Sequence, residues 1–261
     1  MTTLFLFAHQ DDEVGVFHEI TATLARGDRA VCVYLTNGAW KDVTPEIRNA
    51  ETSEVLRRAG VALSDMHFLG TEFSIPGSAL PDNLDRCWDA LVARASQIGG
   101  IDRIIMHAWE GGHHDHDAVH LLGVALAQKL NVLEASRQFP LYRAPGGRLL
   151  VTYGAPLDAN GPVTRSRIPW AKRFQYVSFL RFYRSQKTTV LKVGPLIAWD
   201  YLKDGCQKLQ PVSAKRITER PNSGALLYEI WKLYSYAQFK SNAAAFVARH
   251  DELQVKKTAA A

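Results

Sequence analysis

Apolar and polar positions alternate along the first half of the chain in blocks that predict strands followed by helices. Short apolar runs predict buried strands at 3–8, 29–35, 66–69, 102–107 and 148–153. Helical spacing of apolar residues, with capping residues at some ends, predicts helices at 12–26, 45–59, 82–97 and 118–130. Strands that alternate with helices are typical of a Rossmann-like α/β fold, a mostly parallel sheet with helices on both faces.

The alternation ends near residue 155. A stretch rich in proline and glycine at 154–169 is expected to be a loop, 188–193 a strand, and 224–248 helical in part. We therefore expect a Rossmann-like core over residues 1–155 and a C-terminal elaboration over residues 156–261. Both are predicted to belong to one globular unit, in which the elaboration packs over the strand ends and shapes a cleft.

Two polar clusters follow predicted strands directly. The run HQDDE at 9–13 comes after the first strand, and HHDH at 113–116 comes after the apolar run 104–106. In Rossmann-like orders the first strand and the strand after the third helix are neighbours across the switch point, where ligands bind. The sequence therefore predicts that the two clusters meet in one crevice.

The residue types in these clusters suit a metal. His9 and Asp12 lie three positions apart at a strand-to-helix turn and are expected to face one point, and His116 is expected to be the third ligand. Two imidazoles and a carboxylate, with one position left open, suit a catalytic zinc ion. Asp11 is predicted to be the general base, and His113 to lie beside the metal and act on the substrate.

Two blander interpretations of the same residues stay open. Acidic residues at a helix N-terminus, such as Asp11 and Asp12, often only cap the helix. Five of the nine histidines fall within 107–120, however, which favours a site. A helical ligand pair of His116 and His120 would need a glutamate where Asp117 stands, so His120 is expected to lie on a helix face or to support a ligand.

The composition narrows the class of protein. The 261 residues carry a net charge of +5, and the three cysteines match neither a thiolate metal motif nor a disulfide framework. The N-terminus does not resemble a secretion signal, and no apolar run approaches the roughly 20 residues that span a bilayer. We therefore expect a cytoplasmic protein.

The segment 165–187 interleaves basic and aromatic residues. Three interpretations compete. The segment packs in the core while its basic side chains reach solvent, or it lines the substrate site, with aromatic rings stacked on sugars and basic side chains bound to phosphate, or it contacts a membrane surface. We favour the first and regard the membrane contact as the weakest. No nucleic-acid partner is expected, because no recognised binding module accompanies the charge.

The two polar clusters also carry a family resemblance. The runs AHQDDE at 8–13 and GHHDH at 112–116 resemble the hallmarks of the LmbE-like or PIG-L family of zinc-dependent N-acetylglucosaminyl deacetylases. The family has Ala/Gly-His-Pro-Asp-Asp-Glu after the first strand and His-Pro-Asp-His after the fourth. The resemblance is clear over about residues 1–130 and thin beyond them.

Some positions match the family less well. Gln10 and His114 stand where the family has proline, but neither is a ligand position, so the chemistry is expected to survive. Weaker matches are Arg48 with Glu51 and the dipeptide Ser185-Gln186 after an aromatic residue.

The resemblance implies an enzyme that removes the acetyl group from an N-acetylglucosamine-type sugar in a glycoconjugate or natural-product intermediate. It implies Zn²⁺ as the cofactor, with another divalent transition metal as the alternative, and an N-acetylated sugar as the substrate. Whether that sugar is phosphate-, nucleotide- or lipid-linked stays open. By the family pattern the metal ligands are His9, Asp12 and His116, and the general base is Asp11. His113 stabilises the oxyanion or protonates the leaving amine, and Asp115 holds its ring. Arg48 contacts sugar hydroxyls.

Other functions compete with this one. The same zinc site acting on a different amide is one alternative, and a non-catalytic metal-binding protein, which would not need Asp11, is another. A dinucleotide-binding module would need Gly-x-Gly-x-x-Gly after the first strand, and the sequence at 9–14 lacks it. A homo-oligomer stays open.

Overall fold

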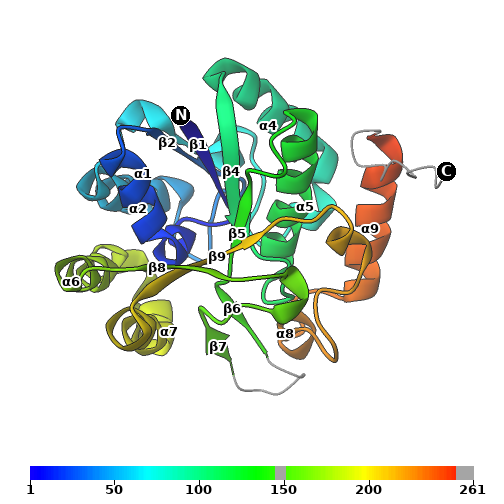
Figure 1. Cartoon of the computed structure of the whole chain (residues 1–261). Helices are drawn as coiled ribbons and strands as arrows, with labels where there is room; N and C mark the ends of the chain where they lie inside the picture. Colours follow the sequence, from blue (N-terminus) through cyan, green and yellow to red (C-terminus); the bar gives the residue numbers. More distant parts are fainter. Residues whose placement is uncertain (145–150, 251–261) are drawn as a thin grey trace.

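The computed structural model describes residues 1–144 and 151–250 and contains a seven-stranded sheet flanked by helices (Figure 1). Its strands are β1 (Thr2–Phe7), β2 (Arg29–Tyr34), β3 (Met66–His67), β4 (Ile101–His107), β5 (Arg137–Phe139), β8 (Thr164–Arg167) and β9 (Cys206–Pro211). The order is β3-β2-β1-β4-β5-β9-β8, parallel from β3 to β5 and antiparallel at β9 and β8. The predicted Rossmann-like fold is confirmed, including the pairing of β1 with β4.

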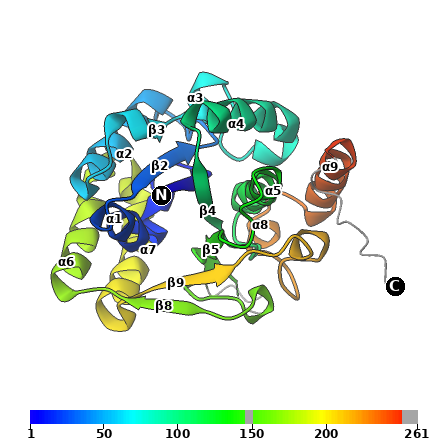
Figure 2. The same cartoon turned by 45° about the horizontal axis from the view of Figure 1, so that its top comes forward.

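Helices cover both faces of the sheet because alternate residues of each strand point to opposite sides (Figure 2). Leu4 and Leu6 of β1 pack on one side, and Phe5 and Phe7 pack on the other. The first core includes residues of α4 (Leu84–Ile98), α5 (His114–Lys129) and α9 (Tyr236–Arg249). The second includes residues of α1 (Phe17–Ala25), α2 (Pro45–Ala59), α6 (Trp170–Phe179) and α7 (Lys187–Trp199).

Smaller elements complete the fold. They are the short helices α3 (Leu69–Glu72) and α8 (Leu227–Ile230), and a separate two-stranded sheet of β6 (Tyr142–Arg143) and β7 (Thr152–Tyr153). In the described ranges, none of the helices has both the length and the apolarity needed to cross a membrane.

The polar clusters sit at helix starts that differ from the expected ones. The helix expected at 12–26 begins as a 3-10 turn, Asp12–Gly15, and α1 starts only at Phe17. Gly15 is packed so closely that a Cβ there would lie 2.7 Å from Leu141 Cδ1. The helix expected at 118–130 begins earlier, because His113 caps α5 by accepting the Asp115 backbone N–H at 3.1 Å. The HHDH cluster therefore forms the first turn of α5.

The prediction of a strand at 188–193 is wrong, since these residues lie within α7. Its β-branched residues suggest a strand, but the apolar Val190, Val193 and Ile197 are spaced three and four apart and pack together against the core. Leu191, between them, is 78% exposed. Helical spacing therefore outweighs β-propensity here.

The last strands of the sheet also differ from expectation. Of the strand expected at 148–153, residues 148–150 lie outside the described part, and Thr152 and Tyr153 form β7, which is not part of the main sheet. The strand that pairs with β4 on the side away from β1 is β5, which the sequence pattern did not predict. The loop expected at 154–169 contains β8, whereas the helical content expected at 224–248 is confirmed by α8 and α9. The division at residue 155 stays a prediction.

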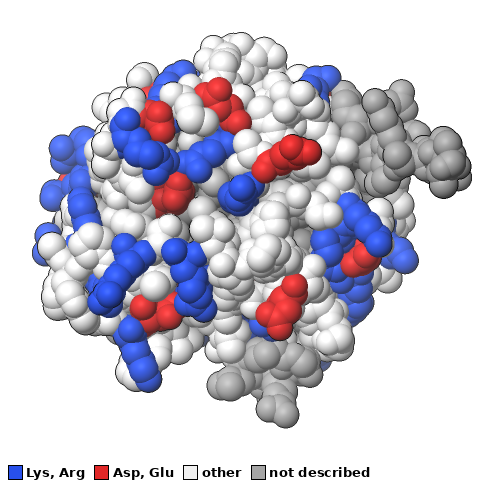
Figure 3. All heavy atoms as spheres, viewed as in Figure 1, with Lys and Arg blue, Asp and Glu red and all other residues white. Residues whose placement is uncertain are grey.

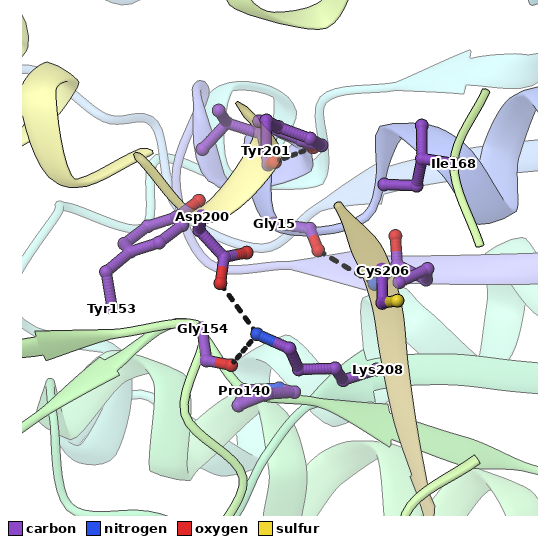
Figure 4. A pocket seen from close by; sticks show the side chains of 11 residues that line it. Gly15, Pro140, Tyr153, Gly154, Ile168, Asp200, Tyr201, Cys206 and Lys208 are labelled. Carbon is purple, nitrogen blue, oxygen red and sulfur yellow. Dashed lines mark hydrogen bonds and ion pairs between the residues drawn. The ribbon is translucent and has the colours of Figure 1, made fainter. Parts of the chain in front are cut away.

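A small pocket shows how the C-terminal segment is fastened to the core (Figure 4). The buried Nζ of Lys208, on β9, lies 2.6 Å from Asp200 Oδ1 and donates to the carbonyl oxygen of Gly154 at 2.9 Å. Pairing of this kind offsets the cost of burying a charge. Gln207 also donates to the carbonyl oxygen of Gly15 at 3.0 Å, which ties β9 to the turn after β1.

Candidate metal centre and active site

The two polar clusters meet where β1 and β4 lie side by side. The ring centroid of His9 lies 5.4 Å from that of His116 and 4.9 Å from that of His113. Ring nitrogens of these three residues lie within 4.8 Å of one another, as one atom from each would around a single ion. The convergence expected at the switch point is therefore present.

Asp12 lies among the histidines and is almost completely buried. Its Oδ1 is 3.2 Å from His116 Nε2, and its Oδ2 is 3.6 Å from His9 Nδ1. Backbone N–H groups of Ala8 and His9 donate to Oδ2 at 3.1 and 2.7 Å. Burial raises the pKa of Asp12, but His116 and His107 outweigh it and hold the pKa well below its usual range. Asp12 is therefore an ionised carboxylate in a dry site.

These residues fit a metal ion. Neither ring nitrogen of the buried His116 makes a hydrogen bond within the described ranges, and its Nε2 meets Asp12 Oδ1 only as a close contact at 3.2 Å. Buried polar atoms normally have hydrogen-bond partners, so these two ring nitrogens beside an ionised carboxylate fit a metal ion. Imidazole nitrogen and carboxylate oxygen are the donors that zinc takes in catalytic sites.

Asp115 orients His9. Its Oδ2 lies 2.8 Å from His9 Nε2 and accepts the Ser78 N–H at 2.6 Å, while its Oδ1 accepts the Leu80 N–H at 3.0 Å. Burial lowers the pKa of His9, but hydrogen bonds with Asp115 and Asp12 outweigh it and raise the pKa to about 10. A metal at Nδ1 must therefore displace a proton, while Nε2–H stays on Asp115.

His113 is held by backbone rather than by a carboxylate. Its Nδ1 accepts the Asp115 N–H at 3.1 Å, whereas the Asp115 Oδ2 is 4.0 Å away. With Nδ1 as the acceptor, a neutral ring carries its proton on Nε2. Burial, the largest influence, holds the pKa of His113 well below its usual value, so the ring is neutral.

Asp11 lies beside these residues in a strained backbone conformation. Its φ is 104°, and its N–H donates to Glu13 Oε2 at 3.0 Å. One Asp11 oxygen accepts from the Arg48 guanidinium at 3.2 Å. Burial raises the pKa of Asp11 to about 6, and Arg48 partly opposes the rise. Near neutral pH this carboxylate is ionised and able to take up a proton.

Arg48 is buried and shapes the loop that carries Asp11. It donates to the carbonyl oxygen of Gly38 at 3.1 Å and to that of Gln10. Gln10 in turn donates to Asn49 Oδ1 at 2.6 Å, so the residue that replaces the family's proline is fixed by hydrogen bonds. Arg48 also lines the cavity in front of the site.

That cavity has a volume of about 340 Å³ and reaches His9, Asp11 and His113 at its base. Trp40 and Trp231 line it as well, although 58% and 46% of their surfaces are exposed. This is the size expected of a small-molecule site.

His107, the last residue of β4, is a site residue that the sequence analysis did not single out. Its ring stacks on that of His116, with centroids 4.0 Å apart and planes 5° apart, and its Nε2 lies 3.1 Å from Asp12 Oδ2. The available signal was its place at a strand end, within the histidine-rich stretch 107–120.

Two contacts join the C-terminal segment to this site. The Tyr183 hydroxyl donates to the buried Glu13 at 2.8 Å. Glu51 accepts both the backbone N–H of Ser185 at 2.8 Å and its hydroxyl at 2.7 Å. The second contact brings together two of the weaker sequence matches.

Part of the segment 165–187 packs in the core, and its role stays a prediction. Tyr176, Phe179 and Tyr183 are buried in the core, whereas Trp170 and Phe174 are exposed. On the face in Figure 3, Lys and Arg side chains gather mainly on the left, and acidic side chains lie among them.

The comparisons with known proteins agree with this geometry. Residues 4–127 match the family model PIG-L, described as GlcNAc-PI de-N-acetylase. A comparison with curated protein sequences finds no match.

Several solved structures share the fold. The zinc-inhibited form of teicoplanin deacetylase Orf2 is 15% identical, with a TM-score of 0.61 over 82% of this chain and 98% of that one. The conserved protein TT1542 from Thermus thermophilus is 21% identical, with a TM-score of 0.55 over 82% and 94% of the two chains. N,N'-diacetylchitobiose deacetylase from Pyrococcus horikoshii is 18% identical, with a TM-score of 0.52 over 80% and 82%. Over residues 4–127, just under half of its length, the chain is similar to the PIG-L family.

Proposed function

We propose that the protein is a metal-dependent amide hydrolase that removes the acetyl group from an N-acetylglucosamine-type sugar. The observation that carries this proposal is the convergence of His9, Asp12 and His116, with the carboxylate of Asp11 beside them and outside their contacts. The family match, and the printed activities of the teicoplanin and chitobiose deacetylases, support the substrate class.

In this proposal His9, Asp12 and His116 hold the metal, which is zinc or another divalent transition metal. When bound, it supplies a Lewis acid and brings the pKa of a coordinated water toward about 7. Asp115 keeps His9 oriented through its 2.8 Å contact. Such supporting contacts commonly govern metal affinity.

Asp11 is the proposed general base. Its pKa of about 6 leaves it ionised at neutral pH, and its salt bridge with Arg48 at 3.2 Å fixes one of its oxygens. It takes a proton from the attacking water as the new C–O bond forms. The same proton is then available for the departing nitrogen.

His113 is the proposed partner of the charge that develops on the carbonyl oxygen. A neutral ring with its proton on Nε2 donates a hydrogen bond where negative charge appears, and it helps to deliver a proton to the amine. The C–N bond breaks, acetate leaves, and the sugar keeps a primary amine.

The cavity of about 340 Å³ is the proposed sugar site. Arg48 and Ser78 supply polar groups for sugar hydroxyls, and the exposed Trp40 and Trp231 flank the path toward whatever the sugar is linked to. Phosphate, nucleotide and lipid linkages are all proposed as partners at this open side.

Acetate and amine release from a panel of N-acetylated sugars tests the proposal. We expect release that stops when a chelator removes the metal and returns when zinc is restored. Release that is insensitive to chelation, or none with any N-acetylated sugar by the metal-loaded protein, would contradict it. Asp11→Asn serves as the control for contaminating hydrolases.

A further inference from the structure

A second cavity adjoins the candidate metal centre, and most of the residues that line it are apolar. It has a volume of about 120 Å³ and adjoins the polar cavity in front of the site, with which it shares four lining residues, His9, Asp11, Tyr142 and Thr189. Its polar wall is formed by His9, Asp11 and Asp12. The remaining wall is mostly aliphatic side chains and tyrosine rings. The aliphatic residues include Val14, Leu141, Leu180, Val190, Val193 and Ile197. We call this cavity the apolar chamber.

Two of the four hydroxyl groups around the chamber donate hydrogen bonds to other side chains. The Tyr183 hydroxyl donates to Glu13 at 2.8 Å, and the Thr189 hydroxyl donates to Gln186 at 3.4 Å. Only the Tyr153 hydroxyl, among the described lining residues, is buried without a partner. Walls of this kind accept hydrocarbon and disfavour sugar hydroxyls, which would lose hydrogen bonds there.

The two cavities meet at the reacting centre. Both are lined by His9 and Asp11, so an amide held there has one cavity on each side. His113, the proposed donor to the leaving nitrogen, lines only the polar cavity, and Asp12 lines only the chamber. Because the two substituents of a trans amide point in opposite directions, the nitrogen and its sugar face the polar cavity.

We propose that the apolar chamber binds the acyl group, and that the protein removes acyl chains longer than acetyl from an amino sugar. This inference rests on the proposed function. A dry cavity of about 150 Å³ holds a benzene ring, so a chamber of this size suits a chain of about four to six carbons. An acetyl methyl would leave most of it empty.

The proposed hydrolysis conserves atoms and charge. Water adds its oxygen to the carbonyl carbon, and the C–N bond breaks. One water proton goes through Asp11 or His113 to the nitrogen, and the second passes to the amine as the carboxylic acid ionises. The products are a short-chain carboxylate and the ammonium form of the amino sugar. No further reactant is required.

A series of N-acyl glucosamines tests the inference, because every member releases the same amine. With the zinc-loaded protein, we expect kcat/KM to rise from acetyl through butanoyl to hexanoyl. Burial of each methylene is worth up to about fourfold, so a gain of at least about tenfold is expected overall. Equal or falling kcat/KM along the series would overturn the inference.

Two substitutions on one helix supply the matched comparison. Val193→Phe fills the chamber and is expected to lower the ratio of kcat/KM for the hexanoyl substrate to kcat/KM for the acetyl substrate at least about tenfold. Leu191→Phe lies on the exposed side of α7 and is expected to change neither. Equal losses on both substrates in Val193→Phe, with Leu191→Phe unaffected, would show that the chamber does not select acyl length.

Binding of hexanoate and acetate, measured by calorimetry, separates this inference from the proposed function. We expect hexanoate to bind the zinc-loaded protein at least tenfold more tightly than acetate, and Val193→Phe to remove the difference. Tight hexanoate binding without hydrolysis of any amide would contradict the proposed function and leave the chamber's ligand class standing. Amide hydrolysis with no preference for hexanoate would reject the chamber alone.

An alkyl chain on the sugar's anomeric oxygen is the competing occupant. Octyl N-acetylglucosaminide therefore enters the same assay. If the octyl chain raises kcat/KM and Val193→Phe cancels that gain, the chamber binds the aglycone and the inference is wrong. We expect the octyl chain to give no gain in kcat/KM that Val193→Phe cancels.

Discussion

The imidazole rings of His107 and His116 lie in nearly parallel planes, 4.0 Å apart between centroids, with the His107 Nε2 on the Asp12 carboxylate at 3.1 Å. His107 therefore contacts two of the three proposed ligands, and ligand atoms of Asp12, His107 and His116 lie within 4.8 Å of one another. Its contact with Asp12 Oδ2 leaves Oδ1, the oxygen 3.2 Å from His116 Nε2, directed toward the ligand cluster.

We predict that His107→Phe weakens zinc binding by about 10- to 100-fold, the usual effect of removing a group that orients a metal ligand. His107→Gln, which keeps an N–H donor, should retain more of the affinity. Competition with a chromophoric chelator measures both values. Unchanged affinity in His107→Phe would mean that the ring only fills space.

Asp11→Asn should keep zinc at full stoichiometry but lower kcat by about 10²- to 10⁴-fold, because the amide cannot accept the proton. Asp12→Ala and His116→Ala should instead lose the metal. Elemental analysis and steady-state kinetics on the same preparations separate the two outcomes. Wild-type turnover in Asp11→Asn, or full zinc content in His116→Ala, would refute the assigned roles.

Much of this arrangement follows from the sequence, and the reason is topological. Once strands and helices alternate, right-handed crossovers leave few orders, and the carboxyl ends of β1 and β4 must be neighbours. The meeting of His9 with the cluster around His116 could therefore be predicted. It brings together residues far apart in the chain, since His9 and Asp115, which are in contact, are 106 positions apart.

Other contacts could not be predicted because local pattern does not encode them. Glu13 and Tyr183 are 170 positions apart, and neither residue type specifies the other as its partner. The exposed residues of β8 lack the alternation that marks a strand, and its place is set by pairing with β9. In α7 the β-branched residues obscured a helical stripe that only the packed core defines.

The bridge between Glu51 and Ser185 fixes the turn that precedes α7, and with it the wall that carries Gln186 and Thr189. We predict that Glu51→Ala raises KM roughly three- to tenfold with a smaller change in kcat, because a charge-assisted hydrogen bond that positions substrate-facing groups is lost.

Ser185→Ala removes only the hydroxyl contact and is the matched, milder variant. Initial rates over a range of substrate concentrations give the two constants. A fall in kcat with KM unchanged would place Glu51 in the chemistry instead of in the wall.

The buried carboxyl group of Glu110 should make the free energy of unfolding depend on pH. Its Oε1 accepts the N–H groups of Leu141 and Tyr142 at 2.8 and 3.1 Å, while its Oε2 is buried without a partner. Burial raises the pKa of Glu110 to about 8, with Asp117 adding to the rise and Arg143 opposing it. The folded state therefore binds the proton more tightly, and stability falls as the pH rises from about 4.5 to about 8.

Glu110→Gln keeps an acceptor and removes the ionisation, so its melting temperature should gain on the wild type across that interval. The gain should reach several degrees and level off above pH 8. Thermal melts of the two proteins at matched pH values provide the measurement. A constant difference from pH 5 to pH 8 would show that Glu110 titrates normally.

The position of the metal tests the central claim most directly. Anomalous diffraction from a zinc-loaded crystal should place one ion within about 2.0–2.2 Å of a ring nitrogen of His9, a ring nitrogen of His116 and a carboxylate oxygen of Asp12. Asp11 should lie nearby without coordinating. An ion held without His9 or without Asp12, or a crevice that stays empty at saturating zinc, would contradict the account.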